Sequence, residues 1–331
     1  MVMKEKISEY VDIKRIEFVV TYQCGGKCKH CQMGSRINKG GTHRHVLVEY
    51  AMEAIEKLAT VFDIASVMTF GGEPLYYPDV VAAIHKKATD CGIETRQVIT
   101  NGYFTDSAKK SGIVANALAD AGVNDLLLSV DAFHQEHIPL EPVWQFACDA
   151  ITAKIPGFRL HPAWLVNEKH QNPYNSKTRE LLERFSGLSI PVGKGNNIWL
   201  QGNTIEFLRE YYDDAVLNFS ENGAPEPCLY PLEIKNISID PNGDIGGCGF
   251  AIGNIYQEDA LDIIARYDPH KNEAMLAQIN GGVSGLLAFA KKQGIVVSPS
   301  DYFDECVLCQ AIASQLKNNK YQKIYNIQGE K

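Results

Sequence analysis

Three cysteines near the N-terminus have a spacing that suits an iron–sulfur cluster. Cys24, Cys28 and Cys31 are arranged as C-x3-C-x2-C directly after an apolar run at residues 16–21. Three thiolates at this spacing can hold one [4Fe–4S] cube, which leaves the fourth iron without a protein ligand. Because an iron with an open position can bind a reactant, the pattern predicts a reaction centre rather than only an electron carrier.

Zinc and disulfide chemistry are the alternatives for these thiols. His30 or His43 could complete a Cys3His zinc site, and a disulfide is possible in a secreted protein. The C-x3-C-x2-C spacing is not the usual zinc-knuckle pairing, however, and no second cysteine pair lies nearby to complete a tetrahedron. The spacing alone therefore favours a cluster over zinc without excluding zinc.

The segment at residues 21–31, TYQCGGKCKHC, resembles the signature of radical S-adenosylmethionine (SAM) enzymes. The resemblance implies that the open iron chelates the amino and carboxylate groups of SAM. It also implies that one electron from the cluster cleaves the sulfonium to give a 5′-deoxyadenosyl radical. His30 fills the position before the third cysteine, which in this family is usually aromatic and lies against the adenine. We expect His30 to contact the cofactor, and a merely packed or exposed neutral histidine is the alternative.

A second motif, Gly71-Gly72-Glu73-Pro74, directly follows the second predicted strand. Two glycines at a strand end let the backbone approach a ligand closely, and a carboxylate there can meet a cationic ammonium group. The motif resembles the Gly-Gly-Glu-Pro motif of the same family, which holds the methionyl amino group of SAM. Taken alone, the tetrapeptide could also be a tight turn with a surface glutamate.

Polar residues also follow the third and fourth predicted strands. Asn101 ends the third strand, and Ser129 and Asp131 end the fourth. They resemble family positions near the methionyl and ribose groups of SAM, while capping of the following helix is the alternative role. His134 and His137 come next and are the candidate catalytic residues, because a histidine can orient a substrate or move protons near neutral pH.

A second set of cysteines, Cys228, Cys248, Cys306 and Cys309, lies in the C-terminal third of the chain. Four thiolates can close a fully ligated cluster or a zinc ribbon, and spacing does not separate the two. The expected hairpin around residues 240–244 and the position of Cys248 resemble the twitch domain, a truncated form of the SPASM extension. The resemblance implies one auxiliary [4Fe–4S] cluster, hence two clusters and SAM as cofactors.

The elements expected to position these residues alternate along the first two thirds of the chain. Apolar patterns predict strands at residues 16–21, 64–69, 95–100, 125–130, 158–166 and 188–192, and helices at 47–60, 79–91, 106–121, 141–154 and 176–186. Asp79, Asp106 and Ser176 stand where helix N-caps are expected. This α/β alternation predicts a parallel sheet, in the form of a partial (β/α)6 TIM-type barrel with its chemistry at the carboxyl ends of the strands. We expect an N-terminal segment at 1–13, the barrel at 14–203, a bridging helix at 204–223 and the twitch domain at 224–331.

The composition limits the possible partners. The chain has 331 residues, 45% of them hydrophobic, and a net charge of −8, which argues against a general nucleic-acid binder. Residues 1–12 are charged and have no apolar core, and no apolar run reaches the roughly 20 residues that span a bilayer. We therefore expect no membrane partner and a cytoplasmic protein with reduced thiols.

The resemblance implies hydrogen abstraction from a substrate C–H bond, with reduced flavodoxin or ferredoxin as the electron donor. A peptide is the expected substrate, and oxidation or a crosslink is favoured over epimerisation. The reason is that Gly249 stands where peptide epimerases of this size carry a hydrogen-donating cysteine, while Cys91 and Cys148 are expected to be structural. Dehydrogenation of a small polyol or amino sugar is the second hypothesis. A non-catalytic iron–sulfur or zinc protein is the third, and it predicts no SAM binding.

Overall fold

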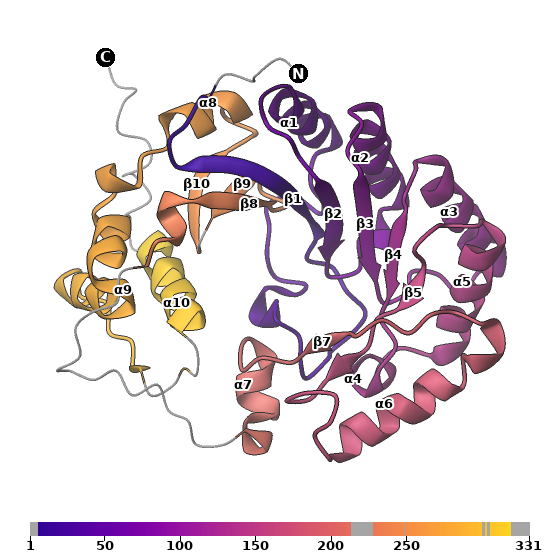
Figure 1. Ribbon diagram of the computed structural model, residues 1–331. Helices are drawn as coiled ribbons and strands as arrows, with labels where there is room; N and C mark the ends of the chain where they lie inside the picture. Colours follow the sequence, from indigo (N-terminus) through magenta and orange to yellow (C-terminus); the bar gives the residue numbers. More distant parts are fainter. Residues whose placement is uncertain (1–5, 213–227, 248, 300–301, 303–304, 319–331) are drawn as a thin grey trace.

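The structure is a computed structural model that describes residues 6–212, 228–247, 249–299, 302 and 305–318. One sheet of eight strands, in the order β10-β9-β8-β1-β2-β3-β4-β5, curls around a central lumen (Figure 1). Its strands are β1 Val11–Thr21, β2 Ser66–Gly71, β3 Thr95–Thr100, β4 Asp125–Leu128, β5 Arg159–Leu160, β8 Ile234–Ile239, β9 Asp244–Gly247 and β10 Phe250–Asn254. A separate parallel pair consists of β6 Ala163–Trp164 and β7 Asn196–Asn197.

Helices follow the parallel strands and cover the outer face of the sheet (Figure 1). The helices are α1 Val48–Val61, α2 Pro78–Asp90, α3 Ala108–Asp120, α4 Ala132–Gln135, α5 Leu140–Thr152, α6 Pro173–Glu183, α7 Asn203–Phe207, α8 Ala260–Arg266, α9 Glu273–Lys292 and α10 Glu305–Asn318. The strands β1 to β5 are all parallel to their neighbours. The predicted α/β fold with a partial TIM-type barrel is thus confirmed.

Apolar periodicity explains the packing of the barrel wall. Ile55 and Leu58 of α1 are fully buried, at the three-residue spacing that puts side chains on one helix face. Ile16 and Phe18 of β1 are also fully buried, at the two-residue spacing of one strand face. Ile16 is in register with Val67 of β2, so one apolar layer continues from strand to strand.

The lumen contains a polar network that crosses four strands. Arg15 of β1 donates to Gln97 of β3 at 2.7 Å, and Gln97 donates to Asp125 of β4. Arg159 of β5 forms an ion pair with the same aspartate. Since the side chains of Arg15, Gln97 and Asp125 come from the amino-terminal halves of their strands, this network lies below the carboxyl-end loops and leaves those loops to form the site.

Several predicted details are wrong. The sixth strand, predicted at residues 188–192, is replaced by a 3-10 turn at Ser186–Leu188 and an isolated bridge from Val192 to Leu160. Val192 is 51% exposed, so this apolar run does not enter the core. The three N-caps are also misplaced by one to four residues: the cap positions are Tyr77, Ser107 and Asn172.

The C-terminal part of the chain joins the barrel sheet directly. Strand β8 is parallel to β1, with Ile237 opposite Ile16, and β9 and β10 continue the sheet as antiparallel strands. The predicted hairpin around residues 240–244 therefore lies at the carboxyl end of β1. Of the predicted bridging helix at residues 204–223, the described part contains α7 and a 3-10 turn at Arg209–Tyr211. No helix among the described residues is long and apolar enough to cross a membrane.

Candidate functional site

The loop after β1 brings the first two cysteine thiols toward one point. A Cβ atom placed on Gly26 would lie 3.4 Å from the sulfur of Cys24 and 3.2 Å from the sulfur of Cys28. Glycine at this position therefore leaves a cradle between the two thiols. Burial raises the pKa of Cys24 to about 12, and burial followed by the charge of Asp131 raises that of Cys28 further. Cys28 is buried and Cys24 is partly buried. Both thiols must lose a proton to bind a metal, and bonds to the metal would compensate that cost.

The spread of the thiols suits a cluster better than a single ion. Within the described part of the chain, the one group of three possible ligand residues whose ligand atoms all lie within 4.8 Å of one another is His30, Asp131 and His134. At least one pair among the sulfurs of Cys24, Cys28 and Cys31 is therefore more than 4.8 Å apart. One zinc ion needs its sulfurs at about 2.3 Å from itself, whereas a cube spreads its ligands over several ångströms. The zinc alternative for this triad fits the geometry less well.

Asn38 holds the first cysteine in place, and sequence reasoning missed it. Its side-chain oxygen accepts from the amide of Cys24 at 3.0 Å, and its amide nitrogen donates to the carbonyl of Cys24 at 2.9 Å. The amide of Asn38 donates to Tyr22 O at 2.9 Å. No local motif marks this contact, because the partners are fourteen positions apart in the sequence.

Glu73 is a fully buried carboxylate at the end of β2. Its Oε1 accepts from Thr100 Oγ1 at 2.7 Å and from the amide of Leu75 at 2.9 Å, and its Oε2 accepts from the amide of Asn101 at 2.9 Å. Burial raises the pKa of Glu73 to about 7, although these hydrogen bonds oppose the rise. The charge of His134 also opposes the rise, but no described residue forms an ion pair with Glu73. A buried carboxyl with a raised pKa and no ion pair is suited to receive an ammonium group.

The two glycines before Glu73 are required by close packing on the end of β1. Gly71 has φ of +138°, and a Cβ there would lie 2.5 Å from Thr21 O. A Cβ on Gly72 would lie 2.2 Å from Gln23 O. Any larger residue would push the cluster loop away from β2, so both glycines position Glu73 beside the cysteine loop.

Asn101 and Ser129 lie at the same edge of the sheet. The side-chain nitrogen of Asn101 is 3.6 Å from the sulfur of Cys24, which places the end of β3 next to the cluster loop. Ser129 is 6% exposed, and its amide donates to Thr100 O at 2.9 Å. The ends of β2, β3 and β4 thus meet around the cysteine loop, as the sequence predicted.

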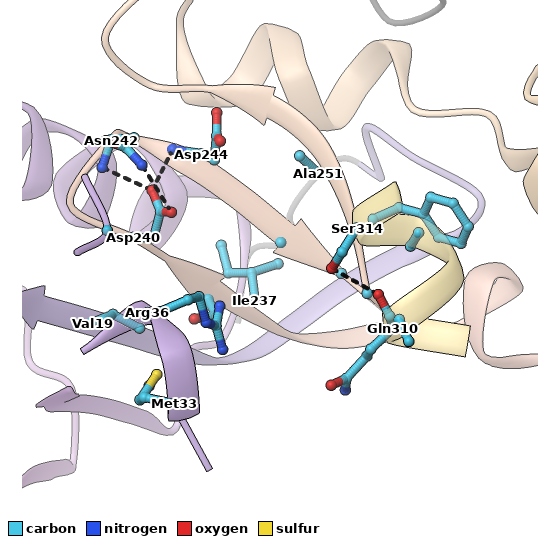
Figure 2. Close-up of a pocket in the computed structure, with 18 of the residues that line it drawn as sticks. Val19, Met33, Arg36, Ile237, Asp240, Asn242, Asp244, Ala251, Gln310 and Ser314 are labelled. Atoms are coloured by element: carbon cyan, nitrogen blue, oxygen red, sulfur yellow. Dashed lines mark hydrogen bonds between the residues drawn. The ribbon is translucent and has the colours of Figure 1, made fainter. Parts of the chain in front are cut away.

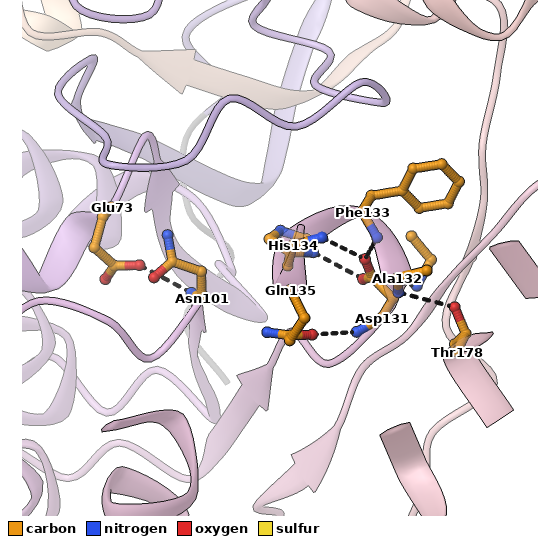
Figure 3. A network of polar contacts seen from close by, with 9 residues as sticks. Glu73, Asn101, Asp131, Ala132, Phe133, His134, Gln135 and Thr178 are labelled. Atoms are coloured by element: carbon orange, nitrogen blue, oxygen red, sulfur yellow. Dashed lines mark hydrogen bonds and ion pairs between the residues drawn. The ribbon is translucent and has the colours of Figure 1, made fainter. Parts of the chain in front are cut away.

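Asp131, which is buried, and His134, which is partly buried, form a pair just after the end of β4 (Figure 3). Asp131 is fully buried; its Oδ1 caps α4 by accepting from the amides of Phe133 and His134, both at 3.0 Å. Its Oδ2 lies 2.8 Å from His134 Nδ1.

The contact between Asp131 and His134 shifts the pKa values of both groups. Burial alone would raise the pKa of Asp131, but the attraction of His134 outweighs it and brings the value to about 2. Burial alone would lower the pKa of His134, but the attraction of Asp131 outweighs burial and raises that pKa. In Figure 3 the imidazole of His134 lies between Asp131 and the Glu73–Asn101 pair.

His30 joins this pair, and His137 does not. The ring of His30 lies 4.8 Å from the ring of His134 and 5.1 Å from that of Phe133. Burial, with a smaller effect of His134, lowers the pKa of His30 to about 4. Its Nδ1 is buried without a hydrogen bond in the described structure, so it can receive one from a ligand. His137 lies two residues after α4, is exposed, and is not part of the group formed by His30, Asp131 and His134.

The pair gives a testable stability prediction. We expect Asp131→Ala to lower the free energy of unfolding by about 3 kcal/mol, because it leaves a partly buried histidine without its partner and removes the cap of α4. We expect Asp131→Asn to stay folded and to lower the pKa of His134, which a histidine NMR titration measures. His137→Gln is the matched control and should change neither quantity. An unchanged His134 titration in Asp131→Asn would contradict this account.

The C-terminal cysteines are only partly described. Cys306 and Cys309 lie one turn apart on α10, the first exposed and the second buried, and Cys228 Sγ accepts from Gln278 Nε2 at 3.5 Å. Cys248 lies outside the described residues. Its neighbour Gly249 is close to α10, since a Cβ there would lie 3.2 Å from the side chain of Gln310. The chain thus runs past α10 at the residue next to Cys248.

A cavity of about 1280 Å³ lies between the cluster loop, the C-terminal strands and α10 (Figure 2). Its walls combine polar side chains, glycines and apolar side chains. Arg36 comes from the cluster loop, Asp240 and Asn242 come from the β8–β9 turn, and Gln310 and Ser314 come from α10. The cavity meets the cysteine loop at residues 32–36, 40 and 41.

Comparison with known proteins then decides the family. The family model of the radical SAM superfamily matches residues 18–215, which include the cysteine triad and all the strand ends described above. The chain belongs to the radical SAM superfamily. Membership implies a [4Fe–4S] cluster and SAM, and the cradle at Gly26, the acceptor at Glu73 and the orphaned Nδ1 of His30 fit these groups.

The curated relatives match only part of this chain. GTP 3′,8-cyclase of Limosilactobacillus fermentum is 31% identical over 132 residues, which is 40% of this chain and 36% of that protein. GTP 3′,8-cyclase of Moorella thermoacetica is 24% identical over 156 residues, 45% of this chain and 46% of that protein. The chain thus spans less than half the length of these curated relatives. Among solved structures, native anSMEcpe with bound AdoMet covers 96% of this chain and 99% of its own, at a TM-score of 0.53 and 12% identity, which supports the fold alone.

Proposed function

We propose that this radical SAM protein oxidises or crosslinks a peptide substrate. Cys24, Cys28 and Cys31 are the proposed ligands of the first cluster. When bound, the cluster and SAM supply a 5′-deoxyadenosyl radical that abstracts a hydrogen atom from a substrate C–H bond. The observation that carries the proposal is the convergence of the thiol cradle and the buried carboxylate of Glu73 at one edge of the sheet.

The residues of the strand ends have distinct proposed roles. Glu73 receives the methionyl ammonium of SAM, while Asn101 and Ser129 contribute polar groups on the same side of the lumen. His30 offers its ring and its unbonded Nδ1 to the adenine. Asp131 fixes the tautomer of His134, so that His134 Nε2 is the nitrogen left to accept a proton from the oxidised substrate.

The cavity supports a peptide over a small sugar. Clefts for small ligands typically measure about 300–1,000 Å³, and the cavity beside the cluster loop is larger, at about 1280 Å³. Cys228, Cys248, Cys306 and Cys309 are the proposed ligands of an auxiliary cluster, which would accept the second electron of an oxidation. Reduced flavodoxin or ferredoxin is the proposed source of the first electron.

The first experiment is made on anaerobically reconstituted protein. We expect about eight irons and eight sulfides per chain, as two cubes require, and 5′-deoxyadenosine on addition of SAM and dithionite. About four irons with 5′-deoxyadenosine would remove the auxiliary cluster from the proposal. Zinc alone, without SAM cleavage, would overturn the proposed enzyme function.

A second assay tests the substrate class. Three probes are added to the reconstituted protein: a short peptide encoded beside the gene, an amino sugar, and GTP, the last because the curated relatives are named GTP 3′,8-cyclases. The peptide should increase 5′-deoxyadenosine formation and lose mass in units of two hydrogens. Consumption of the sugar or of GTP instead would overturn the peptide proposal and leave the radical chemistry standing.

A further inference from the structure

Two segments that are far apart in the sequence meet next to the cysteine loop: residues 38–47 and the β8–β9 turn with Tyr256. Residues 38–47 leave the loop and lead into α1, and the β8–β9 turn with Tyr256 lies against them. Asn242 Oδ1 in that turn accepts from Thr42 N at 2.7 Å and from Thr42 Oγ1 at 3.0 Å. Tyr256 Oη accepts from Leu47 N at 2.8 Å and lies 3.2 Å from Pro241 O. The β8–β9 turn and Tyr256 thus form hydrogen bonds to residues 38–47 at two positions, Thr42 and Leu47.

A third contact reaches the start of the cysteine loop itself. Tyr22, which is 5% exposed, donates from its hydroxyl to Asp240 Oδ2 at 3.1 Å. The next residue but one along the chain is Cys24, whose backbone is held by Asn38. Residues 38–47, which Asn242 and Tyr256 contact, therefore begin at Asn38, the residue that holds Cys24.

The turn that makes these contacts is itself rigidly built. Asp240 Oδ1 accepts from Asn242 N at 2.8 Å and from Asp244 N at 3.2 Å. Asn254 Nδ2 donates to Asn242 O at 2.9 Å, which ties the turn to the end of β10. Gly243 has φ of +82°, and the ring of Tyr256 packs where its Cβ would be, at 2.6 Å. A preorganised turn of this kind can hold a loop in one position at little entropic cost.

We propose that the β8–β9 turn and Tyr256 form a clamp on residues 38–47, which makes Asn242 and Tyr256 positioning residues for the first cluster. The proposal rests on the proposed function in one respect, namely that Cys24, Cys28 and Cys31 are the cluster ligands. Without the clamp, residues 38–47 lose three hydrogen bonds to the C-terminal part, and Asn38 no longer holds Cys24 in a fixed place. The cluster would then exchange its iron faster, while the barrel remains folded.

The test compares Asn242→Ala and Tyr256→Phe with Lys235→Ala, an exposed substitution on β8 whose ion pair with Glu233 does not involve the cysteine loop. Hydrogen exchange of the metal-free proteins is read first. Each of the two clamp variants should accelerate exchange in residues 22–47 by roughly fivefold to thirtyfold, as expected for the loss of one or two hydrogen bonds of about 1 kcal/mol each. Peptides from α5 and β4 should be unchanged, which separates loss of the clamp from general destabilisation.

Iron loss from the reconstituted proteins to a chelator is read second, through the decay of the cluster absorbance. It should accelerate by a similar factor in both clamp variants and stay at the wild-type rate in Lys235→Ala. Wild-type exchange and wild-type iron loss in both clamp variants would overturn the clamp. If Cys28→Ala leaves the iron content at the wild-type level, the proposed ligand set is overturned instead. The hydrogen-exchange data would still decide the clamp.

Discussion

Replacement of Cys28 by alanine is expected to abolish SAM cleavage. Cys28 is 7% exposed, and its sulfur lies on the cradle formed by Gly26, so a loss of this ligand leaves two thiols, too few to hold a cube with one open iron. Iron in the reconstituted protein should fall from about eight to about four per chain. Formation of 5′-deoxyadenosine with SAM and dithionite should fall to the level of a protein-free mixture.

Two matched variants make this result specific. Cys148→Ala changes a half-buried thiol on α5 and should keep both the iron content and SAM cleavage. Cys309→Ala should lower the iron content by a similar amount but keep uncoupled SAM cleavage, because the open iron belongs to the first site. SAM cleavage that survives in Cys28→Ala would contradict the ligand set, and cleavage that vanishes in Cys309→Ala would contradict the separation of the two sites.

The parts of the site that the sequence predicted are contiguous motifs at strand ends. Each of Gly71-Gly72-Glu73, Asn101 and Asp131 follows a short apolar run, and parallel strands bring their carboxyl ends to one edge. That rule alone was enough to expect these residues together. The rule could not predict which hydrogen bonds these residues form. One carboxylate oxygen of Asp131 caps α4 and the other contacts His134, and both contacts depend on the geometry of the first turn of that helix.

Contacts between distant segments could not be predicted in this way. Asn242 binds Thr42 across 200 positions, and Tyr22 binds Asp240 across 218. They exist because β8 pairs with β1, and nothing local in either strand specifies that pairing. The misplaced sixth strand has a related cause, since an apolar run such as the one ending at Val192 becomes a strand only where the tertiary structure covers it.

Glutamine in place of Glu73 is expected to weaken SAM binding and to change how stability depends on pH. The ordinary glutamate pKa of 4.5 rises to about 7 in the SAM-free fold, so the folded chain holds this proton more tightly than the unfolded chain. The resulting stabilisation is complete below pH 4.5 and is lost as the pH rises through 7. Relative to Glu73→Gln, wild-type protein without metal and SAM should lose about 3 kcal/mol of unfolding free energy between pH 4 and pH 8.

Bound SAM is expected to remove this disadvantage of the wild-type protein relative to Glu73→Gln at pH 8. Its ammonium would pair with the Glu73 carboxylate and offset the free-energy cost of ionising that carboxylate. Calorimetry on reconstituted protein at pH 8 should show roughly a hundredfold weaker SAM binding for Glu73→Gln, since a buried ion pair that loses one partner costs about 3 kcal/mol or more. The control Glu53→Gln, at a largely exposed residue of α1, should alter neither the pH dependence nor the affinity. Equal SAM affinity in wild type and Glu73→Gln would show that the ammonium binds elsewhere. A parallel pH dependence of the two proteins would show that Glu73 stays ionised in the empty fold, stabilised by its hydrogen bonds from Thr100, Leu75 and Asn101.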